Sequence, residues 1–364
     1  MNQAQTSKTV ASIGIILASV AAAFAPLPGV KKNLVIVSGT ELQEPLTELE
    51  QQFEQDHPGV DLQLEFQGSQ DIANNFIDRK NNFQPHILIA ASGEILEELD
   101  RRYSAQNNQQ AFINPPQAIA KTILVGVAWQ GRGEALFPDG RFSWSRIEQA
   151  MKQRNWNSIA AQEDWGSFDF VITDPTRSNS GQLALHLWLK SDELDVSSPK
   201  AESLVSLIKQ SVYQPSRSTD ILLQEFISRG ANDGDLAIVY ESIALYRWSQ
   251  AKTTQGQPYR IYYPDNTVET IATAGVVKPN TSRNIAITAN EFVEYLTQPE
   301  QQEVFIKYGF RPVVTTLDIS SVLNSPWSQN IPGAKLNLPK TTPRPPNASE
   351  IREIQRLWSR VTQK

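Results

Sequence analysis

The sequence predicts an α/β protein built on a mostly parallel sheet. Near the N-terminus, three successive units follow one order: an apolar strand, a small polar turn and an amphipathic helix. The strands are expected at 33–37, 60–66 and 86–90. The hydroxyl residues of the turns that follow them are Ser38, Thr40, Ser69 and Ser92. Ligands of parallel sheets bind at the carboxyl ends of strands, so these four residues are candidate ligand contacts.

The helices between these strands are predicted from the spacing of apolar residues. In the first helix, four apolar residues recur at spacings of four, three and four, which places them on one face. These residues are Leu42, Leu46, Leu49 and Phe53. The sequence His57-Pro58-Gly59 ends this helix because proline cannot continue it. Helices over 71–80 and 94–102 follow the second and third strands.

The remaining chain continues to alternate strands and helices. Loops are expected at 106–117 and 130–141, on either side of a strand at 123–129. Further strands are expected at 168–173, 235–240, 259–263 and 270–277. Further helices are expected at 144–151, 180–190, 200–212, 220–229, 241–250, 284–297, 300–308 and 349–361.

The turn at 174–181 is the strongest candidate for a binding element. Its polar residues and its glycine are Thr176, Arg177, Ser178, Ser180 and Gly181. Ser180 is a suitable N-cap, and a strand that ends in such a turn leaves backbone N–H groups pointing outward. The helix dipole adds positive potential, so the turn can receive an anion or a strongly polar group. The same features also fit an ordinary capped turn without a ligand.

Composition indicates a globular protein long enough for two domains. The chain has 364 residues, of which 40% are hydrophobic and 20% charged, with a net charge of −6. No basic block occurs, so nucleic acid is not expected as a partner. The three histidines lie far apart, and no GxGxxG, P-loop, HExxH or GxSxG motif occurs. Neither a cofactor, a metal site nor an enzyme active site is therefore predicted.

The N-terminal segment is predicted to direct export. Residues 9–30 are uncharged and largely apolar, between Lys8 and Lys31. Cleavage is compatible with 21–23 or 23–25, and an uncleaved segment is long enough to anchor the chain in the inner membrane. Residues 1–30 are thus expected to be a signal peptide or an anchor, with the folded part in the periplasm or outside the cell. The absence of Cys excludes disulfides, lipid-modified cysteine and thiol catalysis.

Five blocks of the sequence resemble the type II periplasmic solute-binding proteins, and among them the molybdate- and sulfate-binding group. The blocks are NLVIVSGTELQEPLTELEQQFEQDHPGVDLQLEFQGSQDI, QPHILIAASGEILEEL, DFVITDPTRSNSGQLALHLWL, GDLAIVYESIAL and NEFVEYLTQPEQQEVFIKYGFRPV. They occur in the family's order between residues 33 and 314.

This resemblance implies the periplasmic-binding-protein-like II fold, in which two α/β lobes joined by two crossover segments close over a ligand by hinge motion. The expected segments are lobe one at 31–121 and 272–337, lobe two at 122–271, and a proline-rich linker with an amphipathic helix at 338–364. Such proteins pass a small-molecule or anion ligand to an ABC-type membrane transporter. By position, the turn residues named above and Tyr240 would contact the ligand.

Two residues depart from the pattern of the oxyanion-binding members. Glu41 stands where they usually carry a small hydroxyl residue, and a carboxylate facing the site would repel an oxyanion. His86 stands at the start of the third strand, where they usually carry Asp. Arg177, in contrast, favours an anionic ligand, because a guanidinium beside free N–H groups suits a carboxylate or phosphate.

Alternatives remain open at this stage. The chain could be a membrane-anchored scaffold or sensor that keeps the two-lobed fold without transport. The terminal helix either packs back onto lobe one or docks on a partner. Four tryptophans either belong to the core or line a cleft for a ring-bearing solute. They are Trp129, Trp144, Trp165 and Trp248. The acidic residues Asp169, Asp174, Asp235 and Glu241 are expected to be solvated loop carboxylates rather than an acid/base pair.

Overall fold

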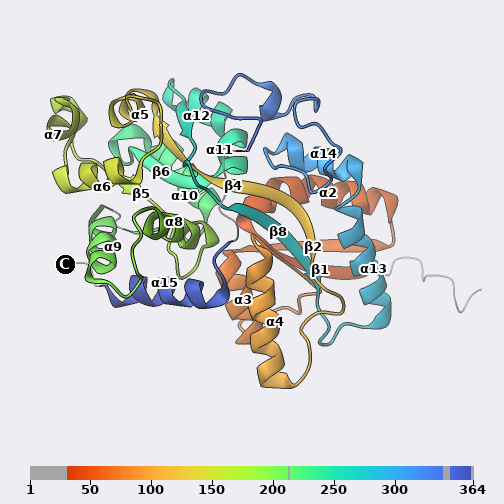
Figure 1. Ribbon diagram of the computed structural model, residues 1–364. Coiled ribbons are helices and arrows are strands. Elements are labelled where there is room, and N and C mark those ends of the chain that lie inside the picture. Colours follow the sequence, from red (N-terminus) through yellow and green to blue (C-terminus); the bar gives the residue numbers. More distant parts are fainter. Residues whose placement is uncertain (1–30, 212–213, 339–344, 362–364) are drawn as a thin grey trace, which may run out of the picture.

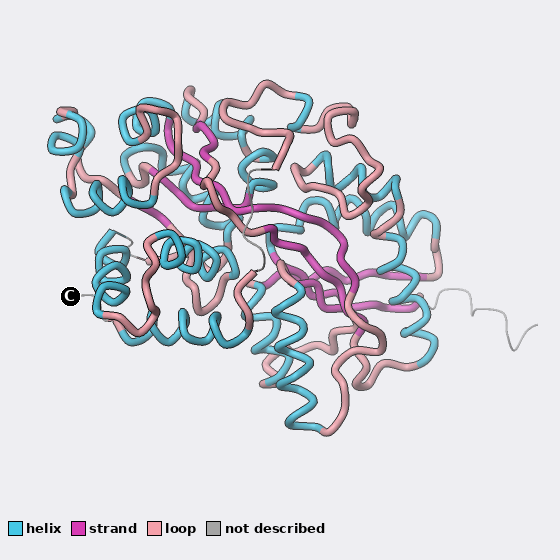
Figure 2. Tube along the Cα trace, in the orientation of Figure 1, coloured by secondary structure: helices cyan, strands magenta, loops and turns pink. Residues whose placement is uncertain are grey.

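A computed structural model describes residues 31–211, 214–338 and 345–361, and shows two α/β lobes that share one curled sheet (Figure 1). Helices lie on both faces of the sheet (Figure 2). The predicted signal or anchor segment at 1–30 and most of the proline-rich linker, 339–344, lie outside the described residues. The eight strands follow the order β2-β1-β3-β8-β4-β6-β5, with β7 paired to β4.

The three predicted βα units form one side of the first lobe. Their elements are β1 (Lys32–Gly39), α2 (Gln43–Asp56), β2 (Val60–Gln67), α3 (Ser69–Ile77), β3 (Ile87–Ala90) and α4 (Gly93–Asn107). As expected for strands linked by helices, β1 pairs in parallel with both β2 and β3. The carboxyl ends of these strands, with their polar turns, therefore lie at one edge of the sheet.

The central residues of strand β1, 34–37, are all apolar because both faces of the strand are covered there. Leu34 and Ile36 belong to a buried cluster with α2 and with two later helices, α13 (Arg283–Tyr295) and α14 (Pro299–Lys307). Val37, which points to the opposite face, belongs to a second cluster with α3 and α4. This two-sided burial explains why the sequence lacks the alternation of a half-exposed strand.

Two long strands connect the lobes. The first half of β4 (Gln117–Trp129) pairs with β8 (Glu269–Val276), and its second half pairs with β6 (Leu236–Tyr240) and β7 (Tyr259–Tyr262). The strand begins at Gln117, whereas the sequence predicted a loop there and a strand from 123. These crossover pairings are antiparallel, and the sheet is parallel only among β1, β2 and β3 and between β5 (Phe170–Val171) and β6.

The second lobe is mainly helical around β4, β5, β6 and β7. Its helices are α5 (Gln130–Leu136), α6 (Trp144–Gln153), α7 (Trp156–Ala160), α8 (Asn179–Ser191), α9 (Pro199–Ser211), α10 (Thr219–Arg229), α11 (Glu241–Tyr246) and α12 (Trp248–Gln255). Helix α5 occupies the start of the predicted loop at 130–141, and α7 was not predicted. Only Phe170 and Val171 of the expected strand at 168–173 pair as a strand.

The terminal helix α15 (Ala348–Arg360) lies across both lobes, against α8 and α9 and, at its start, α4 (Figure 1). An Asn347 capping box fixes its N-terminus. Ile354, Leu357 and Trp358 belong to the hydrophobic core of the second lobe. The helix therefore packs back onto the protein, as one of the two expectations had it, but its apolar face is buried mainly in lobe two rather than lobe one.

Candidate functional site

The polar turns of the two lobes face one another where the strands end. Five helices begin there, after the N-cap residues Gly68, Ser92, Ser178, Ser218 and Tyr240. Contacts cross the interface at α3, where Gln70 N–H donates to Arg177 O at 3.3 Å and Gln182 Nε2 donates to Gln70 Oε1 at 3.3 Å. Helix N-termini from both lobes therefore converge on one cleft, where their N–H groups favour polar ligands.

The two lobes approach each other closely at Gly68. A Cβ atom on this residue would lie 2.8 Å from Arg177 O and 3.0 Å from Arg217 O, both backbone atoms of the second lobe. Any larger side chain would push the two lobes apart, so glycine is required for the closed arrangement. Sequence reasoning placed Gly68 in a polar turn but could not identify what it approaches.

The four predicted residues of the first lobe lie at or just beyond the carboxyl ends of β1, β2 and β3. Ser38 is fully buried and its Oγ donates to Gly39 O at 3.3 Å, while Ser69 Oγ accepts from Ala91 N–H at 3.0 Å. Ser92 is buried at the start of α4. Thr40 Oγ1 is buried without a hydrogen-bond partner. Ser38 and Ser69 are thus already used within the lobe, whereas the Thr40 hydroxyl has unused hydrogen-bonding capacity.

The turn before α8 is bonded mainly to its own lobe. Ser178, rather than the predicted Ser180, is the N-cap residue, because its backbone is extended while Ser180 is already helical. Ser180 Oγ lies 2.8 Å from Thr173 Oγ1 and accepts from Thr219 Oγ1 at 2.6 Å. A Cβ at Gly181 would collide with Thr173 O, which explains the glycine.

Thr176 and Arg177, at the tip of this turn, bond to carboxylates. Thr176 donates its N–H and its hydroxyl to Asp174 Oδ1 at 2.8 and 2.7 Å. Arg177 donates to Asp71 of α3 through Nε at 3.1 Å and Nη2 at 2.7 Å. The guanidinium therefore joins the two lobes through a carboxylate that sequence reasoning did not single out. Its charge is compensated without a ligand.

Tyr240 lies at the end of β6, where the resemblance placed it. It is almost fully buried, and its hydroxyl accepts from Asn179 Nδ2 at 2.9 Å. Burial raises its pKa well above the usual value, and the nearby Glu41 carboxyl acts in the same direction. The hydrogen bond joins Tyr240 to Asn179, which also borders the small cavity beneath the C-terminal segment.

Glu41 points back into the cleft. It belongs to a short 3₁₀ turn, η1 (Thr40–Leu42), that packs against α10 of the second lobe. Its carboxylate lies over Gly39, where any Cβ would collide with it. Burial raises the pKa of Glu41 to about 7, and nearby Asp220 raises it further, whereas its own backbone N–H and the Ser69 hydroxyl oppose the rise. The residue marked in the sequence as a departure thus faces the site.

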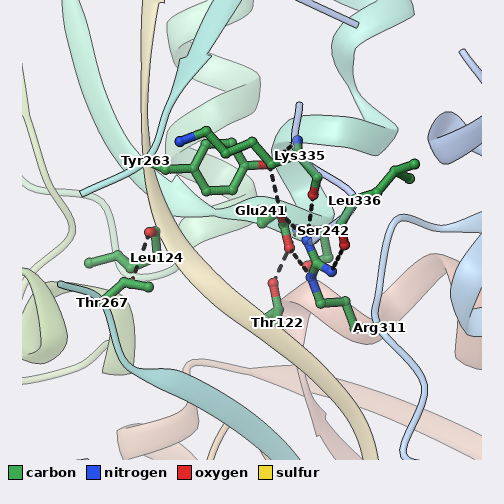
Figure 3. A network of polar contacts seen from close by, with 9 residues as sticks. All are labelled: Thr122, Leu124, Glu241, Ser242, Tyr263, Thr267, Arg311, Lys335 and Leu336. Atoms are coloured by element: carbon green, nitrogen blue, oxygen red, sulfur yellow. Dashed lines mark hydrogen bonds and ion pairs between the residues drawn. The ribbon is translucent and has the colours of Figure 1, made fainter. Parts of the chain in front are cut away.

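A buried ion pair lies where the chain passes between the lobes. Arg311 donates to Glu241 through Nε at 2.8 Å and Nη2 at 2.9 Å, and Tyr263 O–H donates to Glu241 Oε1 at 2.6 Å (Figure 3). The backbone of Arg311 also exchanges two hydrogen bonds with Lys121 of β4. The expectation that Glu241 is a solvated loop carboxylate is wrong, because its side chain is 0% exposed and paired.

Asp235 is also buried, so the same expectation fails there. It pairs with Arg132 of α5, and Asp169 N–H donates to its Oδ2 at 2.6 Å. Burial raises the pKa of Asp235 to about 7, although the Asp169 N–H and Arg132 oppose the rise. Both carboxylates hold elements of the fold together, and neither belongs to the cleft.

The aromatic and histidine side chains have structural roles. Trp129 stacks on Phe226 at 4.8 Å in the second-lobe core, and Trp144 stacks on Trp188 at 4.8 Å. Trp165 packs against the same core, and Trp248 Nε1–H donates to Tyr259 O at 3.1 Å. His86 Nδ1 accepts from Val35 N–H at 2.9 Å, which ties β3 to β1. The tryptophans thus fit the core alternative rather than an aromatic cleft.

The outer side of the cleft is covered by the C-terminal segment. A cavity of about 10 Å³ is bounded by Ser92, Asn179 and Thr270 together with Pro345, Pro346 and Ile351. This volume is about that of one water site, so the lobes are closed with little free space. A larger cavity of about 290 Å³ lies between α3, α4 and α15. Among the described residues, no helix is both long and apolar enough to cross a bilayer.

Residues 34–311 match a family described as bacterial extracellular solute-binding protein. A comparison with curated proteins finds no match.

Solved structures with low sequence identity share the fold. The sulfate-binding protein SubI from Mycobacterium tuberculosis H37Rv is 15% identical with a TM-score of 0.56, covering 78% of this chain and 88% of that one. A periplasmic thiamin binding protein is 12% identical with a TM-score of 0.61, covering 92% and 97%. Iron-bound HitA from Pseudomonas aeruginosa is 15% identical with a TM-score of 0.57, covering 90% and 97%. The chain therefore belongs to the bacterial extracellular solute-binding protein family and has the two-lobed fold of type II periplasmic binding proteins.

Proposed function

We propose that this protein captures a small polar solute between its lobes and presents it to an ABC-type transporter in the membrane. The observation that carries the proposal is the convergence of helix N-termini and polar turns from both lobes on one closed cleft. Catalysis is not part of it, because the buried carboxylates outside the cleft serve structural ion pairs. Membership of the family supports the same role.

The proposal assigns the ligand contacts to the residues predicted from the sequence. These are Ser38, Thr40, Ser69, Ser92, Thr176, Arg177, Ser178, Ser180, Gly181 and Tyr240. It keeps the lobes at 31–121 with 272–337 and at 122–271, and the terminal segment at 338–364. The change of β4 from pairing with β8 to pairing with β6, between Ile123 and Leu124, supports the first of these boundaries.

We propose further that the protein acts in the periplasm or outside the cell. The extracellular family and the uncharged segment 9–30 support export. Residues 1–30 serve either as a cleaved signal peptide or as an anchor in the inner membrane.

A scaffold or sensor without transport is the second candidate function. The observation that favours it is the closed cleft covered by Pro345, Pro346 and Ile351. A scaffold would keep this arrangement permanently, whereas a receptor must open to admit its solute.

Replacing Gly68 by alanine tests the proposal, because the added Cβ would meet Arg177 O and Arg217 O and hinder closure. A screen of oxyanions, carboxylates, sugars and amines against the full-length protein should find a solute that raises the melting temperature. At a hundred times its Kd, this solute stabilises by about 2.7 kcal/mol. We expect Gly68→Ala to weaken its binding about tenfold or more, since fewer molecules can reach the closed state.

Gly59→Ala is the matched control, because a Cβ there meets nothing within 4 Å. If both variants bind the solute as tightly as the wild type, capture by lobe closure is refuted. If no compound in the screen changes the melting temperature, the scaffold candidate is favoured instead.

A further inference from the structure

The Glu41 carboxylate is buried between the lobes, folded back over Gly39 in a turn that packs against α10. Its Oε1 atom is buried and has no hydrogen-bond partner. The groups that face it from the second lobe are the carboxylate of Asp220 and the hydroxyl of Tyr240, and from the first lobe the hydroxyl of Ser69. A buried carboxylate with an empty acceptor position costs free energy unless a donor or a positive charge reaches it.

The nearby arginines already form ion pairs with other carboxylates. Arg177 is bonded by Asp71, as described above, and Arg247 donates to Asp220 through Nε at 2.5 Å and Nη2 at 2.9 Å. These two pairs cancel in charge. Neither of these two arginines is therefore available to neutralise Glu41.

Other buried polar atoms of the interface also favour a ligand that donates hydrogen bonds. Gln182 is 0% exposed, and its Oε1 is unpartnered although its Nε2 is used twice, toward Gln70 Oε1 and Pro175 O. The Thr40 hydroxyl beside Glu41 is also unpartnered and could accept from, or donate to, such a ligand. Amide and carboxylate oxygens accept but cannot donate, so the matching ligand groups are N–H or O–H donors.

We propose that the cleft binds an organic ammonium solute, with Glu41 as its counter-ion. This inference rests on the proposed solute-binding function and specifies its ligand class. It departs from the oxyanion that the resemblance suggested, because the buried Glu41 carboxylate would repel an oxyanion placed beside it. Burial raises the pKa of Glu41 to about 7, and a cation bound beside it would lower this pKa again and keep the carboxylate ionised.

An organic cation fits the cleft better than a metal ion does. Hard cations take several oxygen ligands, and transition metals take sets of histidine, cysteine and carboxylate side chains. Within 31–211, 214–338 and 345–361, no group of three or more such residues is placed to hold a metal. A single carboxylate surrounded by hydroxyl and amide oxygens suits an ammonium group, which needs one counter-charge and a few acceptors.

The test compares amines with oxyanions on three forms of the full-length protein: wild type, Glu41→Gln and Glu44→Gln. Probes are ethanolamine, putrescine, agmatine and choline on one side, and sulfate, molybdate and citrate on the other. We expect at least one amine to raise the wild-type melting temperature, with binding measured by calorimetry. Glu41→Gln should weaken that amine about 30-fold or more, as for truncating a buried charge pair. Glu44→Gln also removes one negative charge, but outside the buried surroundings of Glu41, and this variant should bind the amine as the wild type does.

Three other outcomes would count against the inference. If oxyanions bind and amines do not, the solute-binding function stands and the ammonium assignment is overturned. The same conclusion follows if an amine binds wild type and Glu41→Gln equally well. If neither class binds, the ammonium assignment fails, and the sugars of the wider screen decide whether the proposed function stands.

A second and independent observation concerns helix α15. Its start is tied to the first lobe by Arg352 Nη1, which donates to Glu98 Oε1 of α4 at 2.9 Å. Its end is tied to the second lobe, where Lys209 Nζ donates to Val361 O at 2.7 Å and Arg360 pairs with Glu202 at 2.9 Å. Between these ends, Ile351 borders the small cavity of the cleft.

We infer that α15 is a strap that holds the lobes closed and must loosen at α4 before solute enters. The tie to α4 is a partly exposed ion pair, whereas the side of α15 that faces α8 and α9 adds buried apolar side chains to its ion pairs. The α4 end is therefore the weaker of the two and the one that releases, since exposed ion pairs contribute little to stability.

Cross-linking tests the strap because the native chain has no Cys. In the full-length protein, Glu98→Cys with Arg352→Cys is joined by a bismaleimide, and Glu202→Cys with Arg360→Cys is the control on the second-lobe side. We expect the first cross-link to slow amide exchange at 68–72 and 173–181 about tenfold, and the control cross-link to leave it unchanged. Equal rates of amide exchange in both cross-linked proteins would overturn the inference that α15 is a strap.

Discussion

Arg311→Ala is expected to lower the free energy of unfolding by about 3–5 kcal/mol, the cost of leaving a buried charge without its partner. Glu241 would remain with 0% of its side chain exposed and would keep only Tyr263 O–H as a close donor. The guanidinium also donates to Lys335 O at 2.7 Å and Leu336 O at 2.6 Å and lies 4.6 Å from the ring of Trp327. Removal of the guanidinium should therefore also loosen the segment around Lys335 and Leu336, which packs over the ion pair.

Equilibrium unfolding in urea at neutral pH measures this effect, and two further variants make it specific. Lys307→Ala removes a more exposed pair with Glu48 and should cost at most about 1 kcal/mol. Combining Arg311→Ala with Glu241→Gln should cost much less than the sum of the single changes, because the second removes the charge stranded by the first. Additive effects, or a loss below 1 kcal/mol for Arg311→Ala, would show that the pair does not hold the junction.

Glu41→Gln is expected to stabilise the ligand-free protein above pH 7 by about 3 kcal/mol. The pKa of Glu41 rises from 4.5 to about 7 on folding, so the folded state binds more protons than the unfolded state between these values. The contribution of Glu41 to stability is thus fully present below about pH 4.5 and is lost as the pH rises toward 7. Glutamine carries no charge, so the variant should not show this loss.

Unfolding free energies of wild type and Glu41→Gln, measured in steps from pH 4.5 to pH 8, check the sign. The difference between the two unfolding free energies should be near zero at pH 4.5, grow toward pH 7 and then level off. Glu44→Gln is again the control and should follow the wild-type curve. A difference in unfolding free energy that stays constant across this pH range would mean that burial does not raise the pKa of Glu41. It would also remove one support of the ammonium assignment.

Local sequence determined most of the secondary structure and the position of the cleft along the chain. The apolar runs at 33–37 and 86–90 and the alternating segment at 60–66 are strands with the expected parallel pairing. Burial on both faces selects the two apolar runs, whereas the alternating segment forms an edge strand. The polar turns after them lie together at the cleft, since parallel strands end on one side of a sheet. Errors in the boundaries arose where tertiary pairing extends a strand, as when β8 draws β4 back to Gln117.

Tertiary structure alone decided which charges are compensated. Arg177 and its partner Asp71 are 106 residues apart in sequence, and Arg311 and Glu241 are 70 apart. Neither pairing has a periodicity or spacing that a single sequence reveals, so Arg177 suggested an anion and Glu241 a solvated carboxylate. Glu41 was noticed from its position in the first turn, but its direction depends on Gly39 leaving room and on α10 closing over it. The charge of the cleft is a sum over both lobes, and only folding brings those groups within interaction distance.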